Sequence, residues 1–173
     1  MSAKRRQAPR VLVACASFKG TLTSHAASLA VARGLRDAGF RTETLALADG
    51  GEGLVEALVR AVPGAWTIAV PCRGPLGERR RARIALLPPA AGRKVRTAVI
   101  EMAASSGLPL VPAAQRDPQC TTTQGVGDQL RAALGHGARA ILLGIGGSAT
   151  NDAGAGMAQA LGARLLDADG REL

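Results

Sequence analysis

The stretch that decides the fold is Ile141-Leu142-Leu143-Gly144-Ile145-Gly146-Gly147-Ser148-Ala149-Thr150-Asn151-Asp152-Ala153-Gly154-Ala155-Gly156-Met157. An apolar run turns into a loop of glycines and small polar residues, and apolar periodicity resumes at Met157. This order predicts a buried strand, a tight loop and a helix. Glycines let the backbone approach a ligand closely, and a helix start presents unpaired N–H groups. The stretch therefore predicts an anion site, most simply for a phosphate, and a crowded turn without a ligand is the alternative.

The composition is that of a globular protein. The chain has 173 residues, of which 47% are hydrophobic and 20% charged, enough for a substantial core. No apolar run approaches the roughly 20 residues that cross a bilayer, so we expect no membrane partner. Residues 1–10 are basic but lack a following secretory apolar region, which predicts a disordered basic tail. Cys15, Cys72 and Cys120 show no paired or C-x-x-C spacing, which favours reduced thiols and a cytoplasmic location.

The formal net charge of +9 raises the question of a nucleic-acid partner. The one dense internal basic run is Arg79-Arg80-Arg81-Ala82-Arg83. Aromatic residues make up only 2% of the chain and tyrosine is absent, so a base-stacking platform is hard to assemble. We expect a solvated, arginine-rich surface that attracts anionic ligands, and no nucleic-acid partner.

The N-terminal part has the pattern of a β-α-β unit. Residues 11–16 form an apolar run, and Thr23 or Ser24 can cap a helix that Gly39 ends. Residues 41–47 alternate as a second strand. This order predicts parallel pairing of the Rossmann or flavodoxin-like type, with a ligand edge at the strands' carboxyl ends.

The predicted fold class is α/β, and the order of strands and helices changes after residue 65. A helix starting near Leu54 closes a first α/β segment over residues 11–65. Strands at 66–70, 80–87 and 95–102 follow without intervening helices, which predicts a mixed sheet in a second segment over residues 66–173. The triplet Thr121-Thr122-Thr123 leads into a further helix, and a last strand enters a turn at Asp169-Gly170. Glu101, at a strand end, is either the partner of an arginine or a ligand-binding carboxylate.

With these segments in place, the chain resembles the type I glycerate kinase family. The matching motifs, in family order, are Ser17-Phe18-Lys19-Gly20, Ala48-Asp49-Gly50-Gly51-Glu52-Gly53, Gly74-Pro75-Leu76-Gly77, Ile100-Glu101-Met102-Ala103-Ala104, Thr121-Thr122-Thr123 and Gly144-Ile145-Gly146-Gly147-Ser148-Ala149-Thr150-Asn151-Asp152. The resemblance implies ATP- and Mg²⁺-dependent phosphorylation of a glycerate hydroxyl on a fold of two α/β domains. Family chains are about twice as long, so we expect an N-terminal half, truncated at its C-terminal end and incomplete relative to that fold. Family members commonly carry an Asp where this chain has Ala16.

The resemblance and the chemistry of phosphoryl transfer suggest roles for the loop residues. Lys19 is the candidate phosphate-binding cation, unless it is a plain surface lysine. Asp49 and Glu52 are candidates for holding Mg²⁺ or orienting the substrate hydroxyl, unless they cap the helix near Leu54. Asp152 completes the predicted catalytic set. Predicted to bind substrate or phosphate are Ser17, Gly50, Gly51, Thr121, Thr122, Thr123, Gly146, Gly147, Ser148, Thr150 and Asn151.

Two other functions compete with a kinase that uses glycerate and a nucleotide. Gly144-Ile145-Gly146-Gly147-Ser148-Ala149 fits the dinucleotide pattern G-x-G-x-x-A, and Asp167 follows at roughly the required offset of ~20 residues. Against the dinucleotide alternative, residues 151–156 separate this pattern from the next helix, whereas the pattern requires a helix at its last position. The second competitor is a non-catalytic remnant that binds phosphate ligands or a partner, favoured by the chain length and Ala16. A homo-oligomer or a complementing C-terminal half is the expected protein partner.

Overall fold

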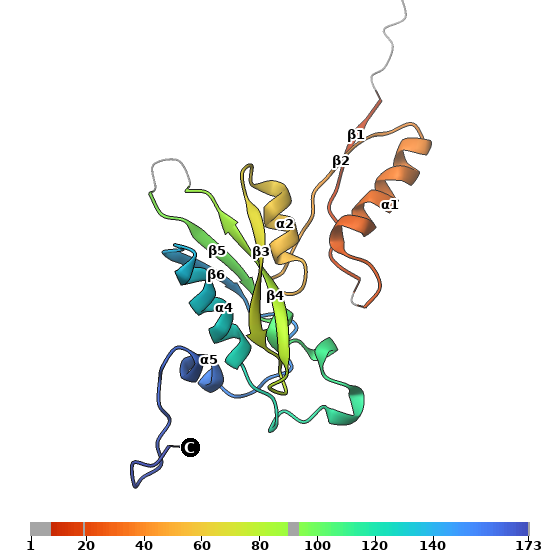
Figure 1. The fold of residues 1–173 in the computed structure, drawn as a ribbon. Coiled ribbons are helices and arrows are strands. Elements are labelled where there is room, and N and C mark those ends of the chain that lie inside the picture. Colours follow the sequence, from red (N-terminus) through yellow and green to blue (C-terminus); the bar gives the residue numbers. More distant parts are fainter. Residues whose placement is uncertain (1–7, 19, 90–93, 173) are drawn as a thin grey trace, which may run out of the picture. The chain divides into compact units, whose positions relative to one another are not determined.

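A computed structural model of the chain describes residues 8–18, 20–89 and 94–172. Backbone contacts divide it into two compact units, one that ends at Asp49 and one that begins at Gly50 (Figure 1). Both units combine helices with parallel or mixed strands, which confirms the predicted α/β class. Residues 1–7 of the predicted tail lie outside the described residues, and Arg10 already belongs to the first strand.

The first unit is the predicted parallel β-α-β. Its elements are β1 (Arg10–Val13), α1 (Ser24–Asp37) and β2 (Arg41–Thr44). The two strands pair in parallel. The hydroxyl of Thr23 caps α1 by accepting a hydrogen bond from the Ala26 N–H at 3.2 Å, and Gly39 follows the helix with φ +87°. Both predicted helix boundaries are therefore confirmed, because each rests on local backbone chemistry.

Small side chains bring α1 close to the strands. Ala27, Ser28 and Ala32 are buried on the inner face of the helix. The second strand is shorter than predicted, since regular pairing ends at Thr44 instead of continuing to residue 47. Beyond Thr44, the Leu47 N–H donates to the side-chain oxygen of Ser24 at 2.8 Å, so a helix side chain replaces the neighbouring strand as partner.

The second unit contains a four-stranded mixed sheet. Its elements in chain order are α2 (Leu54–Ala61), β3 (Trp66–Arg73), β4 (Arg79–Leu87), β5 (Thr97–Glu101), α3 (Ala103–Ser106), two 3₁₀ turns at Leu108–Leu110 and Ala113–Gln115, α4 (Gln124–Gly135), β6 (Ala140–Gly144) and α5 (Ala155–Ala160). The strand order is β3-β4-β5-β6. The first two pairings are antiparallel and β5 pairs with β6 in parallel, which confirms the predicted mixed sheet.

Helices cover both faces of this sheet, and β4 shows how. Ile84 and Leu86 belong to the cluster under α4, whereas Ala85 and the partly buried Leu87 belong to the cluster under α2. Successive strand residues point to opposite faces, so this alternation makes three layers, with α2 and α4 on opposite sides in Figure 1. Helix α2, which the sequence grouped with the first segment, therefore packs in the second unit.

The predicted strand near residue 165 is a short turn. Leu166 and Glu172 form an isolated antiparallel bridge, and the chain reverses at Asp169-Gly170 as expected. Among the described residues, no helix is both long enough and apolar enough to cross a membrane.

Candidate functional site

In the first unit, the two predicted ligand loops follow neighbouring strands. Ser17 comes after β1 and Asp49 after β2, and the carboxyl ends of parallel neighbours meet at one edge of a sheet. Ser24 joins the chain at this edge, because its hydroxyl donates to the Cys15 carbonyl at 2.7 Å and accepts from the Leu47 N–H at 2.8 Å. Ser17 and Asp49 are exposed, while Lys19 lies outside the described residues.

In the second unit, the glycines that end β6 allow one backbone to lie on another. The Gly146 N–H donates to the Gly50 carbonyl at 2.9 Å. A Cβ at Gly144 would collide with the Gly50 carbonyl, and one at Gly146 would lie 2.7 Å from the Gly51 Cα. The structure thus brings Gly50, Gly51 and Gly146 together, and close approach within the protein already requires glycine at positions 144 and 146.

Asp152 joins the threonine loop to the loop after β6. Its Oδ2 accepts hydrogen bonds from the Thr123 N–H and hydroxyl, both at 2.8 Å, and from the Gly156 N–H at 3.1 Å. Its Oδ1 accepts from the Gly154 N–H at 3.1 Å. Burial alone would raise the pKa of Asp152, but the hydrogen bonds from Thr123, Gly156 and Gly154 outweigh it and hold that pKa below its ordinary value.

The N–H groups at the start of α5 are therefore hydrogen-bonded to other groups of the protein. The Ala155 N–H donates to the Asp152 carbonyl at 2.8 Å, and the Met157 N–H donates to the Thr123 hydroxyl at 2.9 Å. The sequence predicted that such N–H groups would face a phosphate, whereas here the Asp152 carboxylate is the anion that they meet. Thr123 stands at the N-cap position of α4, but its hydroxyl donates to Asp152.

Glu101 caps α2, a role that sequence reasoning missed. The N-cap residue Gly53 has φ +94° and no side chain to offer. The Val55 N–H donates to Glu101 Oε1 at 2.7 Å, so this carboxylate from β5 occupies the position predicted for Asp49 or Glu52. Burial raises the pKa of Glu101, partly offset by its hydrogen bonds to Val55 and Gly53. Glu52 is exposed.

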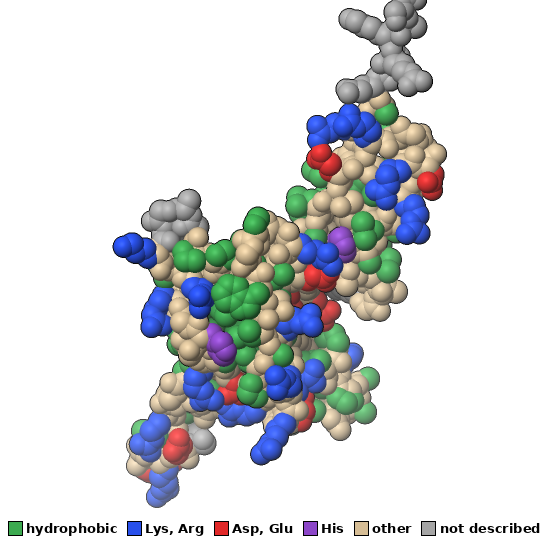
Figure 2. Space-filling model, turned by 45° about the horizontal axis from the view of Figure 1, so that its top comes forward, with side chains coloured by type: hydrophobic (Ala, Val, Ile, Leu, Met, Phe, Trp, Pro, Cys, Tyr) green, Lys and Arg blue, Asp and Glu red, His purple; other side chains and the backbone are tan. Residues whose placement is uncertain are grey.

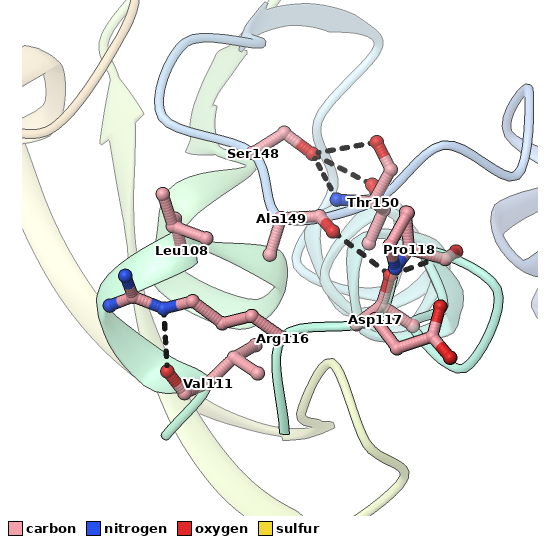
Figure 3. A pocket seen from close by; sticks show the side chains of 9 residues that line it. Leu108, Val111, Arg116, Asp117, Pro118, Ser148, Ala149 and Thr150 are labelled. Carbon is pink, nitrogen blue, oxygen red and sulfur yellow. Dashed lines mark hydrogen bonds between the residues drawn. The ribbon is translucent and has the colours of Figure 1, made fainter. Parts of the chain in front are cut away.

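A pocket of about 260 Å³ lies beside the loop after β6 (Figure 3). Its lining residues are Leu108, Val111, Arg116, Asp117, Pro118, Thr121, Ser148, Ala149 and Thr150. The Ser148 and Thr150 hydroxyls lie 2.7 Å apart, and the Thr150 N–H donates to Ser148 Oγ at 2.9 Å. The Thr121 hydroxyl donates to the Ala149 carbonyl at 2.9 Å. Three of the predicted binding residues, Thr121, Ser148 and Thr150, thus share one pocket.

Other predicted residues of the second unit lie outside this lining. The Thr122 hydroxyl accepts from the Gln124 N–H at 3.2 Å, and Asn151 and Gly147 are exposed. Beside Asn151 and Asp152, Ala153 has φ +50°, an uncommon conformation for a residue with a Cβ. Strained backbone of this kind concentrates at ligand-binding loops.

Arg116 is the pocket residue that sequence reasoning missed. It stands in irregular chain after the second 3₁₀ turn, outside every glycine-rich motif. Its Nε donates to the Val111 carbonyl at 3.3 Å. Its guanidinium adds a positive charge to a pocket whose predicted binding residues, Thr121, Ser148 and Thr150, contribute only hydroxyl groups.

The geometry disfavours the dinucleotide alternative. The fingerprint needs a helix at its last position, yet α5 begins only at Ala155. The candidate ribose partner, Asp167, belongs to the terminal turn, where its Oδ1 accepts from the N–H groups of Asp169 at 2.9 Å and Arg171 at 2.8 Å.

Comparison with known proteins gives the family. The sequence model of the glycerate kinase family matches residues 11–173. The chain belongs to this family. It is 48% identical over 166 residues to a glycerate kinase of Bacillus subtilis (strain 168) and 45% identical over 166 residues to a glycerate 2-kinase of Escherichia coli (strain K12). Each match covers 95% of this chain and 42% of the relative.

A solved structure supports the same assignment. A Salmonella typhimurium LT2 protein described as glycerate kinase 2 superimposes with a TM-score of 0.73 at 46% sequence identity. The match covers 96% of this chain and 43% of that one. The chain therefore spans about two fifths of the length of the family members it matches.

Proposed function

We propose that this chain takes part in transferring the γ-phosphate of ATP to a hydroxyl of glycerate. The observation that carries the proposal is the pocket where Ser148, Thr150 and Thr121 come together beside the loop that follows β6. Ligands of α/β proteins bind beyond the carboxyl ends of parallel strands, and β5 and β6 are such a pair. Four relatives named glycerate kinase or glycerate 2-kinase are 40–48% identical to the chain over 94–95% of its length and 42% of their own.

Phosphoryl transfer depends on positioning and charge neutralisation more than on covalent chemistry. In this proposal the Ser148–Thr150 pair holds a substrate oxygen, and the Thr121 hydroxyl holds the Ala149 carbonyl in place. Lys19 is the proposed phosphate-binding cation. Asp152 acts differently, because its four hydrogen bonds hold the loop and the start of α5 in place. We assign it a positioning role in place of the catalytic role that the sequence suggested.

For Mg²⁺ we propose Glu52 in the second unit, and Asp49 is the corresponding candidate in the first unit. Nucleotide enzymes commonly hold Mg²⁺ with one or two carboxylates plus substrate phosphates, and bound Mg²⁺ neutralises charge on the transferred phosphate. Glu52 offers an exposed carboxylate in the loop that Gly50 anchors against Gly146. Within the described ranges, no group of three or more His, Cys, Asp or Glu residues could hold a metal on its own.

The proposal is tested by phosphorylation of glycerate. We expect phosphoglycerate and ADP when the chain is supplied with ATP, Mg²⁺ and glycerate, alone or with the unmatched part of the Bacillus subtilis relative added as a separate polypeptide. Thr150→Val should lower kcat/KM about tenfold or more, because it removes a pocket hydroxyl. Thr67→Val, at an exposed threonine of β3, is the matched control and should leave activity unchanged. Absence of transfer in both arrangements would overturn the proposal.

A non-catalytic phosphate-binding protein is the second candidate. The observation that favours it is the complete use of the Asp152 carboxylate and the Thr123 hydroxyl inside the loop. A rise in melting temperature with ATP and no turnover would support this candidate. For either function we propose a cytoplasmic location, supported by three free cysteines.

A further inference from the structure

The pocket beside β6 has two walls that the backbone fixes against each other. One wall comes from residues 108–118 and the other from residues 148–150. The Leu108 N–H donates to the Gly147 carbonyl at 2.9 Å, and the Ala149 N–H donates to the Ser106 carbonyl at 2.8 Å. These bonds hold the walls at a constant separation, so the pocket is formed before a ligand arrives.

Arg116 supplies the positive charge of this pocket. Its Nε makes a long bond of 3.3 Å to the Val111 carbonyl, and Arg116 takes part in none of the ion pairs found among the described residues. The terminal Nη groups are therefore available as a planar fork. Figure 3 shows this side chain and the Ser148–Thr150 pair on different sides of the pocket. A guanidinium fork matches the two oxygens of a carboxylate.

The hydroxyl pair faces Arg116 with one proton to offer. Ser148 and Thr150 each carry one O–H donor, and one of the two protons lies in the 2.7 Å bond between them. Ser148 Oγ also accepts from the Thr150 N–H at 2.9 Å and lies 3.5 Å from the Thr150 carbonyl, so the 2.7 Å bond is the shorter of the two uses open to the Ser148 proton. With the Ser148 proton in that bond, the Thr150 hydroxyl proton is left for a ligand oxygen, which suits an alcohol or another neutral acceptor.

The charge of the lining decides which anion fits. Among the nine lining residues, Arg116 is the one base and Asp117 the one acid. The Asp117 carboxylate accepts from the Gln119 N–H at 2.9 Å and the Cys120 thiol at 3.6 Å, whereas Arg116 has no anionic partner among the described residues, so this one cation suits a ligand of single negative charge. A nucleotide triphosphate, with several charges, would need more cations. Leu108, Val111 and Pro118 provide an apolar surface for a short carbon skeleton.

We propose that this pocket is the subsite for a small hydroxy-carboxylate, with Arg116 pairing its carboxylate and Ser148 and Thr150 facing its hydroxyls. The assignment of glycerate as that acid rests on the proposed function. The geometry of the subsite rests on the pocket alone. Arg116 thereby selects the acid substrate and leaves the nucleotide to other loops.

Binding measured by calorimetry, with one ligand present at a time, tests this subsite separately from catalysis. The probes are glycerate, glycerol, inorganic phosphate and ATP, each titrated into the wild-type chain, Arg116→Gln, Arg116→Lys and Arg60→Gln. We expect Arg116→Gln to weaken glycerate binding about 10- to 100-fold, because a charge-assisted pair is lost. Arg116→Lys should recover part of that loss, since it restores the charge without the fork. Arg60, exposed on α2 and paired only with Glu56 among described residues, is the charge-matched control.

Each outcome either supports the proposed subsite or contradicts it. The subsite stands if Arg116→Gln weakens glycerate but not ATP and glycerol fails to bind, even when no phosphoryl transfer is detected. It falls if wild-type protein binds no glycerate, if Arg116→Gln binds it as well as Arg60→Gln does, or if the variant loses ATP or phosphate instead. Transfer activity with an unchanged KM for glycerate in Arg116→Gln would keep the kinase function and overturn the subsite.

Discussion

Replacing Asp152 by Asn should loosen the junction between the threonine loop and α5. The aspartate accepts four hydrogen bonds, three of them on Oδ2. An asparagine has one acceptor oxygen. If that oxygen takes the Oδ2 position, the new NH₂ group faces the Gly154 N–H, and two donors meet. The remaining bonds lose their charge assistance, so we expect a loss of about 2–4 kcal/mol in the free energy of unfolding.

Urea denaturation followed by the fluorescence of Trp66 measures this loss. Trp66 begins β3 in the unit that holds Asp152, and the Arg96 guanidinium lies 5.0 Å from its ring centroid, so unfolding should change the emission. Asp169→Asn is the matched control. Asp169 makes an exposed ion pair with Arg171, whose removal should cost less than about 1 kcal/mol.

The pH dependence gives the same prediction a second readout. Because the pKa of Asp152 is lower in the folded state than in the unfolded state, its contribution is complete above the unfolded value of about 4. That contribution disappears as the pH falls through the folded value. The gap between wild type and Asp152→Asn should therefore be widest near neutral pH and narrow in acid. A variant as stable as Asp169→Asn at pH 7 would refute the positioning role.

Two further substitutions test other contacts of the second unit. Gly146→Ala should destabilise by about 1–3 kcal/mol, because its Cβ would lie 2.7 Å from the Gly51 backbone, whereas Gly135→Ala has open space and should not; melting temperatures compare them. Glu101→Gln should flatten the stability profile above about pH 4. Burial raises the pKa of Glu101, so the wild type loses stability as the pH rises through the pKa of the folded state. Urea titrations at several pH values measure this loss, and an equally steep pH profile in Glu101→Gln would contradict the prediction.

Much of the fold could be predicted because the deciding signals are local. The cap at Thr23, the glycine after α1 and the apolar run that becomes β6 act through neighbouring residues, and each appears as expected. The mixed sheet followed from strands too close together for crossover helices. The assignment of α2 to a unit could not be predicted, because it depends on which sheet Val55 covers, a contact with β4 and β5 distant in sequence.

The side chains of the site were predicted by type but not by partner. Glu101 was predicted to pair with an arginine or to bind a ligand, yet its observed partner, the Val55 N–H, lies 46 residues away. Arg116 carried no signal, because its place in the pocket depends on how residues 107–121 wrap against residues 147–150. Both omissions have one physical cause, since a side chain's role in a site is set by tertiary contacts that sequence spacing does not encode.

Ligand binding was the role predicted for the loop after β6, and the structure shows that the loop also makes contacts that the protein itself needs. Its glycines and its Asp152 serve the protein itself, since they admit the Gly50–Gly51 backbone and satisfy the start of α5. These internal contacts hold the loop in place without using up the Ser148–Thr150 pair. A hydroxyl proton of this pair can then point into the pocket from a fixed position. Under the proposed function, binding in this loop would therefore depend on residues that need not touch the ligand.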